Sequence, residues 1–436
     1  MKYSSFDILL QTKKMMDIPD YVCNRTSVTN SSAFLNWLPS ARGNKINMGD
    51  FRVLQPWMLA AIAALSRKEV DNAIFPVCEA GRQTAQFANG LGLLRILDGD
   101  AETDYQEEGR TVKLHRVNSY AKIDDLSEKI AKLAIDEDID PDAYFDRQET
   151  EFTLKYILIE LLRNVVQHSG DPSGGVVVAQ RMDFGEDYSH EKAIQICVAD
   201  MGCGIFESLK HMHPDITDNK TALERALWPS LSGTFPKGQT GSSQNAGMGL
   251  FFISEMVKRL AGRMLIASGE NSLLLQGTYE EGVPSKINFI EGGFPGSLIV
   301  VDIPKRSVAD YDALFSKIRE TAIERSISKK KVSFIKFDSF PEDVLTIKLS
   351  IANENTAIAE EFSNKYFIPN IQKGTSLCLD FSGFKIMTQS FLHAVLFRTL
   401  KLAYEKQVQI YAKNLTPAVK DCLLLLEWYT LGKEDD

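Results

Sequence analysis

The sequence has little that would support a metal centre, a disulfide framework or a membrane segment. Its six cysteines form no Cys-x-x-Cys pair and its six histidines have no metal-ligand spacing, which argues against a zinc site and favours reduced, buried thiols. No run of about 18 consecutive apolar residues occurs, and the N-terminus has no apolar stretch and cleavage site typical of a signal peptide. We therefore expect a cytoplasmic protein without membrane contact.

The chain also lacks an excess of positive charge. Lys and Arg number 49 against 58 for Asp and Glu, which gives a net charge of -9. Such a chain has no bulk attraction for a phosphate backbone, so nucleic acid is an unlikely partner. The content of 44% hydrophobic and 25% charged residues excludes wholesale disorder, and 436 residues predict about three domains.

The order of sequence patterns divides the chain into two outer segments (1–135 and 336–436), a middle segment (136–304) and a helical linker (305–335). The first segment contains an apolar helical run at 57–65 and a strand-like AIFPV at 73–77. The last alternates strand-like and helical patterns, which predicts a small α/β domain.

The middle segment contains an apolar helix with one polar stripe. In FTLKYILIELLRNVVQHSG (152–170), helical spacing places Glu160, Asn164, Gln167 and His168 on one narrow face. A buried carboxylate needs a partner, so the stripe either faces a polar ligand, metal or water, or it is the solvent-exposed edge of an amphipathic helix. The helix by itself leaves both interpretations open.

Two glycine-containing segments follow this helix. An apolar strand ends at Asp200 and continues as Gly202-x-Gly204. There a carboxylate can accept a hydrogen bond from an exocyclic amine, and the glycines allow close approach of a flat ring, although ordinary turns use the same residues.

Further along, a Gly, Ser and Asn-rich loop leads into Gly247-Met248-Gly249 and a helix. The backbone N–H groups at a helix N-terminus can bind phosphates; an ordinary flexible loop would look the same. The segment is not a Walker A loop, because no Gly-Lys-Ser/Thr follows.

Together, the order and spacing of these three elements resemble the N, G1 and G2 boxes of the GHKL ATPase superfamily, which includes gyrases, histidine kinases and anti-sigma-factor serine kinases. The resemblance covers about 170 residues and implies an α/β (α+β) fold, a Bergerat-type sandwich. It implies ATP as ligand with Mg²⁺ as cofactor. By position, Glu160 would be the general base for water or a substrate hydroxyl, Asn164 would hold Mg²⁺, and Asp200 would bind the adenine amine.

The remaining residues implied by this resemblance contact the nucleotide. Gly202 and Gly204 would line the base and ribose. A lid from about 207 to 246 would close on the phosphates. The residues expected near the phosphates are Gly247, Met248, Gly249, Leu250 and, in the lid, Thr234 and Lys237, although an exposed loop lysine is the simpler interpretation of Lys237. His168 matches a histidine seen in anti-sigma kinases and is expected to support the structure.

The last segment resembles STAS-like domains, in particular a STAS-like family of domains of unknown function. The resemblance rests on LCLDFSGFKIMTQSFLHAVLF (377–397), a strand, a turn and a helix. In anti-anti-sigma factors this turn carries a phosphorylated serine. Here that position is Gln389, preceded by Thr388 and followed by Ser390. Ser390 is more simply interpreted as the N-cap of the next helix, and phosphorylation of Ser390 or of Ser382 is left open. The first segment fits the STAS-like pattern more loosely at 46–65.

These resemblances predict a STAS-like arm on each side of a Mg²⁺-dependent ATP-binding domain. ATP hydrolysis could drive a conformational switch, or the phosphoryl group could pass to a serine or threonine of a STAS-like or sigma/anti-sigma protein partner. Self-dimerisation would be a further consequence of the first mechanism. A non-catalytic, nucleotide-gated scaffold is the third possibility, although a pure binder would not need Glu160.

Overall fold

A computed structural model describes most of the chain. The described residues are 28–67, 71–79, 81–98, 110–133, 144–183, 192–229, 247–278, 283–304, 310–325, 333–337, 339–351 and 355–431. Among them, no helix is both long enough and apolar enough to cross a bilayer.

The centre of the molecule is a seven-stranded sheet in which every pair of neighbouring strands is antiparallel. From one edge to the other its strands are β3 (Thr111–Val117), β4 (Gly175–Asp183), β5 (Lys192–Asp200), β9 (Ser297–Pro304), β6 (Arg263–Ser268), β7 (Asn271–Gln276) and β8 (Lys286–Glu291). The inner strands are apolar on both sides, as in VVVA of β4 and LIVV of β9. Such strands need a cover on both faces of the sheet.

Three helices cover one face of this sheet: α6 (Ala121–Leu133), α7 (Tyr144–His168) and α10 (Gly249–Arg259). Helix α7 is the apolar helix expected from the sequence. Leu158, Leu161 and Leu162 are fully buried in it, because one side of the helix meets the sheet layer and another meets the C-terminal part of the chain.

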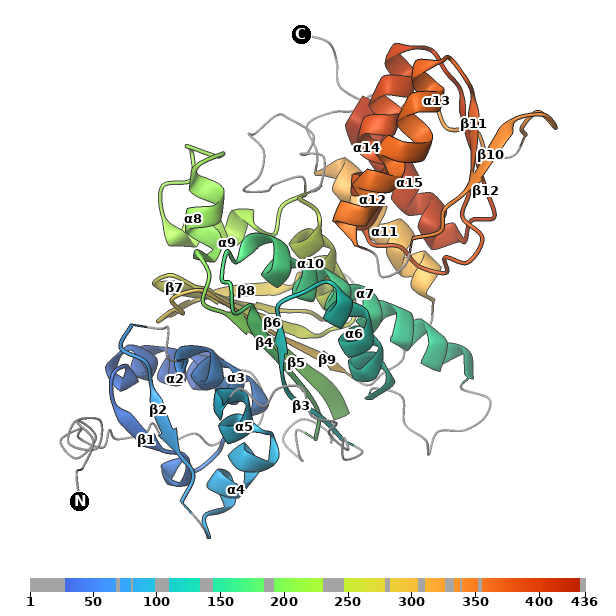
Figure 1. Cartoon of the computed structure of the whole chain (residues 1–436). Helices are drawn as coiled ribbons and strands as arrows, with labels where there is room; N and C mark the ends of the chain where they lie inside the picture. The colour runs from blue at the N-terminus through green and yellow to red at the C-terminus, as the bar shows by residue number, and fades with distance from the viewer. Residues whose placement is uncertain are drawn as a thin grey trace, which may run out of the picture.

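The N-terminal part covers the opposite face (Figure 1). Helix α3 (Pro56–Leu65) starts with a proline at its first position, where no backbone N–H is needed, and all ten of its residues are buried. It packs on β4 and β5. Around it lie α2 (Val28–Ala41), the 3₁₀ helix Met48–Asp50, α4 (Gln83–Gly90), α5 (Leu93–Asp98) and the parallel pair β1 (Lys45–Asn47) and β2 (Phe75–Val77).

The C-terminal part has its own three-stranded parallel sheet, β10 (Leu345–Lys348), β11 (Leu377–Asp380) and β12 (Ile410–Lys413), in that order. Its helices are α12 (Thr356–Phe362), the π-helix Ser363–Phe367, α13 (Ile368–Gln372), α14 (Gln389–Glu405) and α15 (Pro417–Leu431). Helix α11 (Tyr311–Glu324) packs on α15 and on α7 and α10, and so joins this part to the helical layer (Figure 1).

The predicted mixed α/β class is confirmed: the chain combines helices with one antiparallel seven-stranded sheet and small parallel sheets. One detail differs from the expected organisation. Strand β3 and helix α6 belong to the central sheet and its helical layer, although they precede residue 136. Pairing with β4 extends the central sheet into the segment that the sequence pattern grouped with the N-terminus.

Candidate functional site

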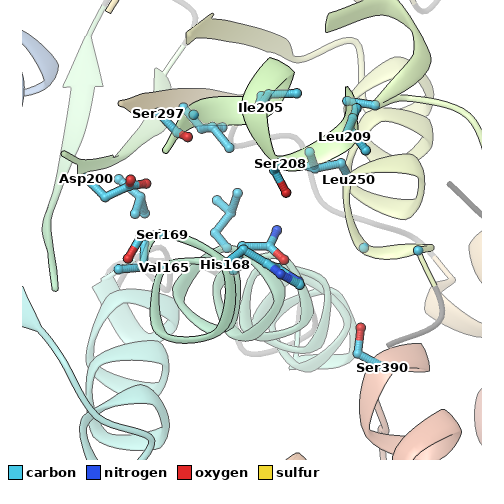
Figure 2. A pocket seen from close by; sticks show the side chains of 18 of the residues that line it. Val165, His168, Ser169, Asp200, Ile205, Ser208, Leu209, Leu250, Ser297 and Ser390 are labelled. Atoms are coloured by element: carbon cyan, nitrogen blue, oxygen red, sulfur yellow. The ribbon is translucent and has the colours of Figure 1, made fainter. Parts of the chain in front are cut away.

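A cavity opens between the helical layer and the end of the sheet where β5 stops and β9 starts. Its empty space, including the open mouth, is about 950 Å³. Apolar side chains from α7, β5, β9 and α8 (Gly204–Lys210) form much of the wall. A few polar groups point inward among them, the composition typical of a small-molecule site. The polar lining residues are Asn164, His168, Ser169, Asp200, Ser208, Ser297 and Ser390; all except Asn164 are labelled in Figure 2.

The polar stripe of α7 divides between two environments. Asn164 and His168 line the cavity. Gln167 instead donates a hydrogen bond from Nε2 to Thr356 Oγ1 of the C-terminal part at 2.5 Å. Burial lowers the pKa of His168 to about 4, so its imidazole is neutral at physiological pH. Glu160 is buried, whereas Asn164, Gln167 and His168 are half-buried, so the stripe faces the cavity and the C-terminal part of the chain.

Asp200 lies at the end of β5, directly opposite Ser297 on β9. The backbone N–H of Gly202 donates to its Oδ1 at 2.8 Å. Burial raises the pKa of this carboxyl to about 7, because the ionised form has lost most of its solvent. Near neutral pH both forms of Asp200 are therefore accessible: the neutral carboxyl can donate a hydrogen bond, and the ionised carboxylate can only accept one.

The two glycines after Asp200 have different roles. A Cβ on Gly202 would lie 2.0 Å from the carbonyl oxygen of Ser169, so a glycine is needed there for packing against the end of α7. Gly202 does not line the cavity, but Gly204 does. Gly204 has φ +75°, and a Cβ there would approach Ser268 Oγ to 2.8 Å.

The segment from Gly247 to Leu250 lines the cavity at the start of α10. Gly247 has a positive φ of 64°, which lets the chain turn into the helix. A Cβ on Gly249 would lie 2.6 Å from Glu160 Oε2. Met248 provides no side-chain cap for the first turn, and the first N–H groups of a helix have no acceptor within the helix itself.

Glu160 lies beside the cavity, 1% exposed, and its carboxylate meets the C-terminal part of the chain. Ser390 Oγ donates a hydrogen bond to Glu160 Oε2 at 2.9 Å, and the Ser390 N–H is 3.5 Å from Oε1. Ser390 also lines the cavity. The contact joins two residues that are 230 positions apart in the chain.

Ser390 does not cap helix α14, contrary to the expectation from sequence. The N-cap is Thr388, whose Oγ1 accepts from the N–H of Phe391 at 3.4 Å. Gln389 is the first residue of the helix, and its side chain points away to Tyr429 and Cys422. The helix therefore starts two residues earlier than the capping argument implied, and this leaves the Ser390 hydroxyl available to Glu160.

Arg163 is a site residue that the sequence reasoning missed. Its guanidinium is buried, with Nη1 2.7 Å from Thr388 Oγ1 and 3.5 Å from Glu160 Oε1. The available signal was a charge three residues after Glu160, which places both side chains on one side of a helix. Arg163 supplies positive charge to Glu160 and anchors the turn that carries Ser390.

Thr234 and Lys237 lie outside the described residues, as does the lid from 230 to 246. The described part of the expected lid, 207–229, contains the last residues of α8, helix α9 (Asn219–Arg225) and the segments that follow them. No protein-family model matches the chain, and no curated protein resembles its sequence at a significant level. The geometry of the cavity therefore carries the functional argument.

Proposed function

We propose that the chain is a GHKL-type ATP-binding protein that catalyses Mg²⁺-dependent phosphoryl chemistry in this cavity. One observation carries the proposal. The cavity brings Asn164, Asp200 and the Gly247–Gly249 segment to one space, with Glu160 at its edge. These are the residues that the resemblance to the N, G1 and G2 boxes implies, and segments far apart in sequence supply them.

The fold supports the same proposal. An antiparallel sheet covered on one face by the helices that carry the first and third boxes, α7 and α10, agrees with a Bergerat-type sandwich. The parallel sheet and helices of the C-terminal part agree with a STAS-like arm. The N-terminal part has only a two-stranded pair and supports a STAS-like arm less well.

Asp200 is suited to recognise the adenine base. A carboxylate with a pKa near 7 is held between its two forms, and a donor such as an exocyclic amine favours the ionised form. Val198 and Ile299 on the neighbouring strands supply apolar surface in the same wall. A flat ring with one amino group fits this combination.

The other end of the cavity is suited to phosphates. The first N–H groups of α10 and the glycines at 247 and 249 provide backbone donors. The side-chain oxygen of Asn164 is a ligand of the type that Mg²⁺ prefers, and a single protein ligand suffices where phosphates and waters fill the remaining positions. When bound there, Mg²⁺ neutralises phosphate charge.

Glu160 is suited to accept a proton. Its Oε2 already accepts a hydrogen bond from a hydroxyl at 2.9 Å, within the distance that a general base requires. Arg163 keeps a positive charge beside Oε1. The hydroxyl that Glu160 contacts belongs to a serine, which favours transfer to a side chain over hydrolysis.

Calorimetric titration with Mg²⁺ and ATP tests the proposal. We expect the wild-type protein to bind ATP, and we expect Asn164→Ala to weaken binding at least tenfold, about 1.4 kcal/mol. Asn364→Ala, at an exposed position of the C-terminal part, is the matched control and should bind like wild type. Failure of the folded wild-type protein to bind any adenine nucleotide would refute the proposal.

A further inference from the structure

We propose that Ser390 is the phosphoryl acceptor of this site, so that the chain phosphorylates itself on its own C-terminal part. The inference rests on the proposed function, because it requires ATP in the cavity. It concerns a residue that the sequence pattern assigned to helix capping.

The first observation is the pairing of a nucleophile with a base. A serine hydroxyl is a weak nucleophile until an adjacent group removes its proton. Ser390 Oγ donates directly to Glu160 Oε2 at 2.9 Å, and both side chains are buried. Capping does not explain this contact, since Thr388 fills the N-cap position.

The second observation is the place of the hydroxyl relative to the cavity. Ser390 lines it together with Asn164, Gly247 and Gly249, the residues proposed to hold the phosphates. Figure 2 shows Ser390 and Asp200 at opposite sides of the view, with His168 between them. A nucleotide with its base at Asp200 would extend its phosphates toward Ser390.

The third observation is that the two residues before Ser390 are held by contacts with α7. Arg163 Nη1 donates to Thr388 Oγ1 at 2.7 Å, and the Gln389 N–H lies 3.4 Å from the Tyr156 hydroxyl oxygen. Both partners are on α7, the helix that carries Glu160. The acceptor turn and the base are therefore both fixed to α7. Bringing the two groups together for the reaction then costs little further entropy.

The reaction balances without a further reactant. Ser390 Oγ forms a bond to the γ-phosphorus of ATP, and the bond from that phosphorus to the bridging β-phosphate oxygen breaks. The electron pair leaves with ADP, and the hydroxyl proton passes to Glu160 Oε2. The products are ADP and a phosphoserine on α14.

Full-length protein incubated with Mg²⁺ and γ-phosphate-labelled ATP, followed by peptide mapping, tests this inference in the wild type. We expect label on Ser390, at a rate per molecule that does not depend on protein concentration. Glu160→Gln should slow labelling at least about a hundredfold, and Ser390→Ala should abolish it at this position. Ser382→Ala, a second serine of the same part outside the cavity, should label at the wild-type rate.

A mixture of the Glu160→Gln and Ser390→Ala proteins distinguishes transfer within a chain from transfer between copies. Our proposal predicts that Ser390 of the Glu160→Gln chain is labelled no faster in the mixture than in that variant alone; faster labelling in the mixture would overturn it. Release of free phosphate alone, label on Thr388 or elsewhere, or ATP binding without labelling would also overturn it. Those results leave the proposed ATP site intact, whereas failure of the wild type to bind ATP removes both.

Discussion

The two ends of the chain attach to the central layers in different ways. The N-terminal part lies on one face of the sheet, and its helix α3 is buried at every residue. The C-terminal part lies on the helical side (Figure 1), where α11 adds apolar packing but the contact with α7 also contains a buried carboxylate, a guanidinium and two hydroxyls.

The N-terminal cover is mainly apolar apart from the Arg67–Asp171 ion pair, whereas the C-terminal contact includes a polar cluster whose ionisation can change. Apolar packing such as that of Trp57 against Phe34, with ring centroids 5.0 Å apart, responds little to charge or ligand. A buried polar cluster depends on every partner being in its correct ionisation state. A change of charge at Ser390 would therefore act on the C-terminal contact and leave the N-terminal cover in place.

The largest expected effect concerns the N-terminal cover. Trp57→Ala removes a fully buried side chain. It should lower the free energy of unfolding by about 4 kcal/mol, because the packed surroundings cannot fill the space that the indole leaves. Urea unfolding measures it. Trp228→Ala is the matched control: this tryptophan is 46% exposed, and its loss should cost less than about 1 kcal/mol, including its contact with Arg225. Equal losses would show that α3 is not a structural cover.

The next effect concerns a buried ion pair that ties the N-terminal part to the loop after α7. Arg67 and Asp171 pair through two hydrogen bonds, with Nη1 and Oδ1 3.1 Å apart. Arg67→Met should cost about 3 kcal/mol, because it leaves Asp171 buried and unpaired. The double variant Arg67→Met with Asp171→Leu should recover most of this loss in urea unfolding. Additive losses would contradict a coupled pair.

A charge at Ser390 should loosen the C-terminal contact. Ser390→Asp places a carboxylate next to Glu160 and should destabilise this contact by about 2 kcal/mol or more. Faster amide hydrogen exchange in α14, with unchanged exchange in α3, is the expected readout. Asparagine has nearly the same shape as aspartate but no charge, so Ser390→Asn should have a smaller effect on hydrogen exchange in α14. Equal exchange in the two variants would show that charge does not control the contact.

The smallest expected effect is on the pH dependence of the free energy of unfolding. It concerns two groups in the cavity that change this free energy in opposite directions as the pH rises. Burial raises the pKa of Asp200 to about 7 and lowers the pKa of His168 to about 4. Between about pH 4 and 6.5, the folded chain keeps the Asp200 proton that the unfolded chain has lost, so this group makes stability fall as pH rises. His168 is neutral in the folded chain and protonated in the unfolded chain, so it makes stability rise with pH.

The two slopes oppose each other in the wild type. Asp200→Asn should therefore make stability rise more steeply with pH, by up to about 1.4 kcal/mol per unit, and His168→Gln should make it fall more steeply by a similar amount. Urea unfolding at several pH values measures both slopes relative to wild type. Slopes that change in the reverse directions would contradict the proposed burial of these side chains.

Much of the cavity could be predicted from sequence, because its parts are local patterns. Helical spacing placed Asn164 and His168 on one face, and a strand ending at Asp200 followed by glycines predicted the turn that closes the wall. The mixed α/β class followed from the resemblance of the motifs and, for the last segment, from its alternating strand and helix patterns. Thr234 and Lys237, in contrast, remain predictions.

Contacts between distant segments could not be predicted in this way. Nothing local indicated that Gln167 would bind Thr356, that Gly202 would pack on Ser169, or that β3 would extend the central sheet. Arg163 carried a weak local signal, but its partner Thr388 lies 225 positions away.

The sequence by itself therefore determined the main helices and strands and where Asn164, His168, Asp200 and the glycines lie on them, because hydrophobic periodicity and glycine act over one helix turn or one strand. Only the tertiary structure decided that Ser390 meets Glu160. That contact depends on the packing of α11, α14 and α15 against α7, in which many weak apolar interactions between distant segments fix the position of one hydroxyl.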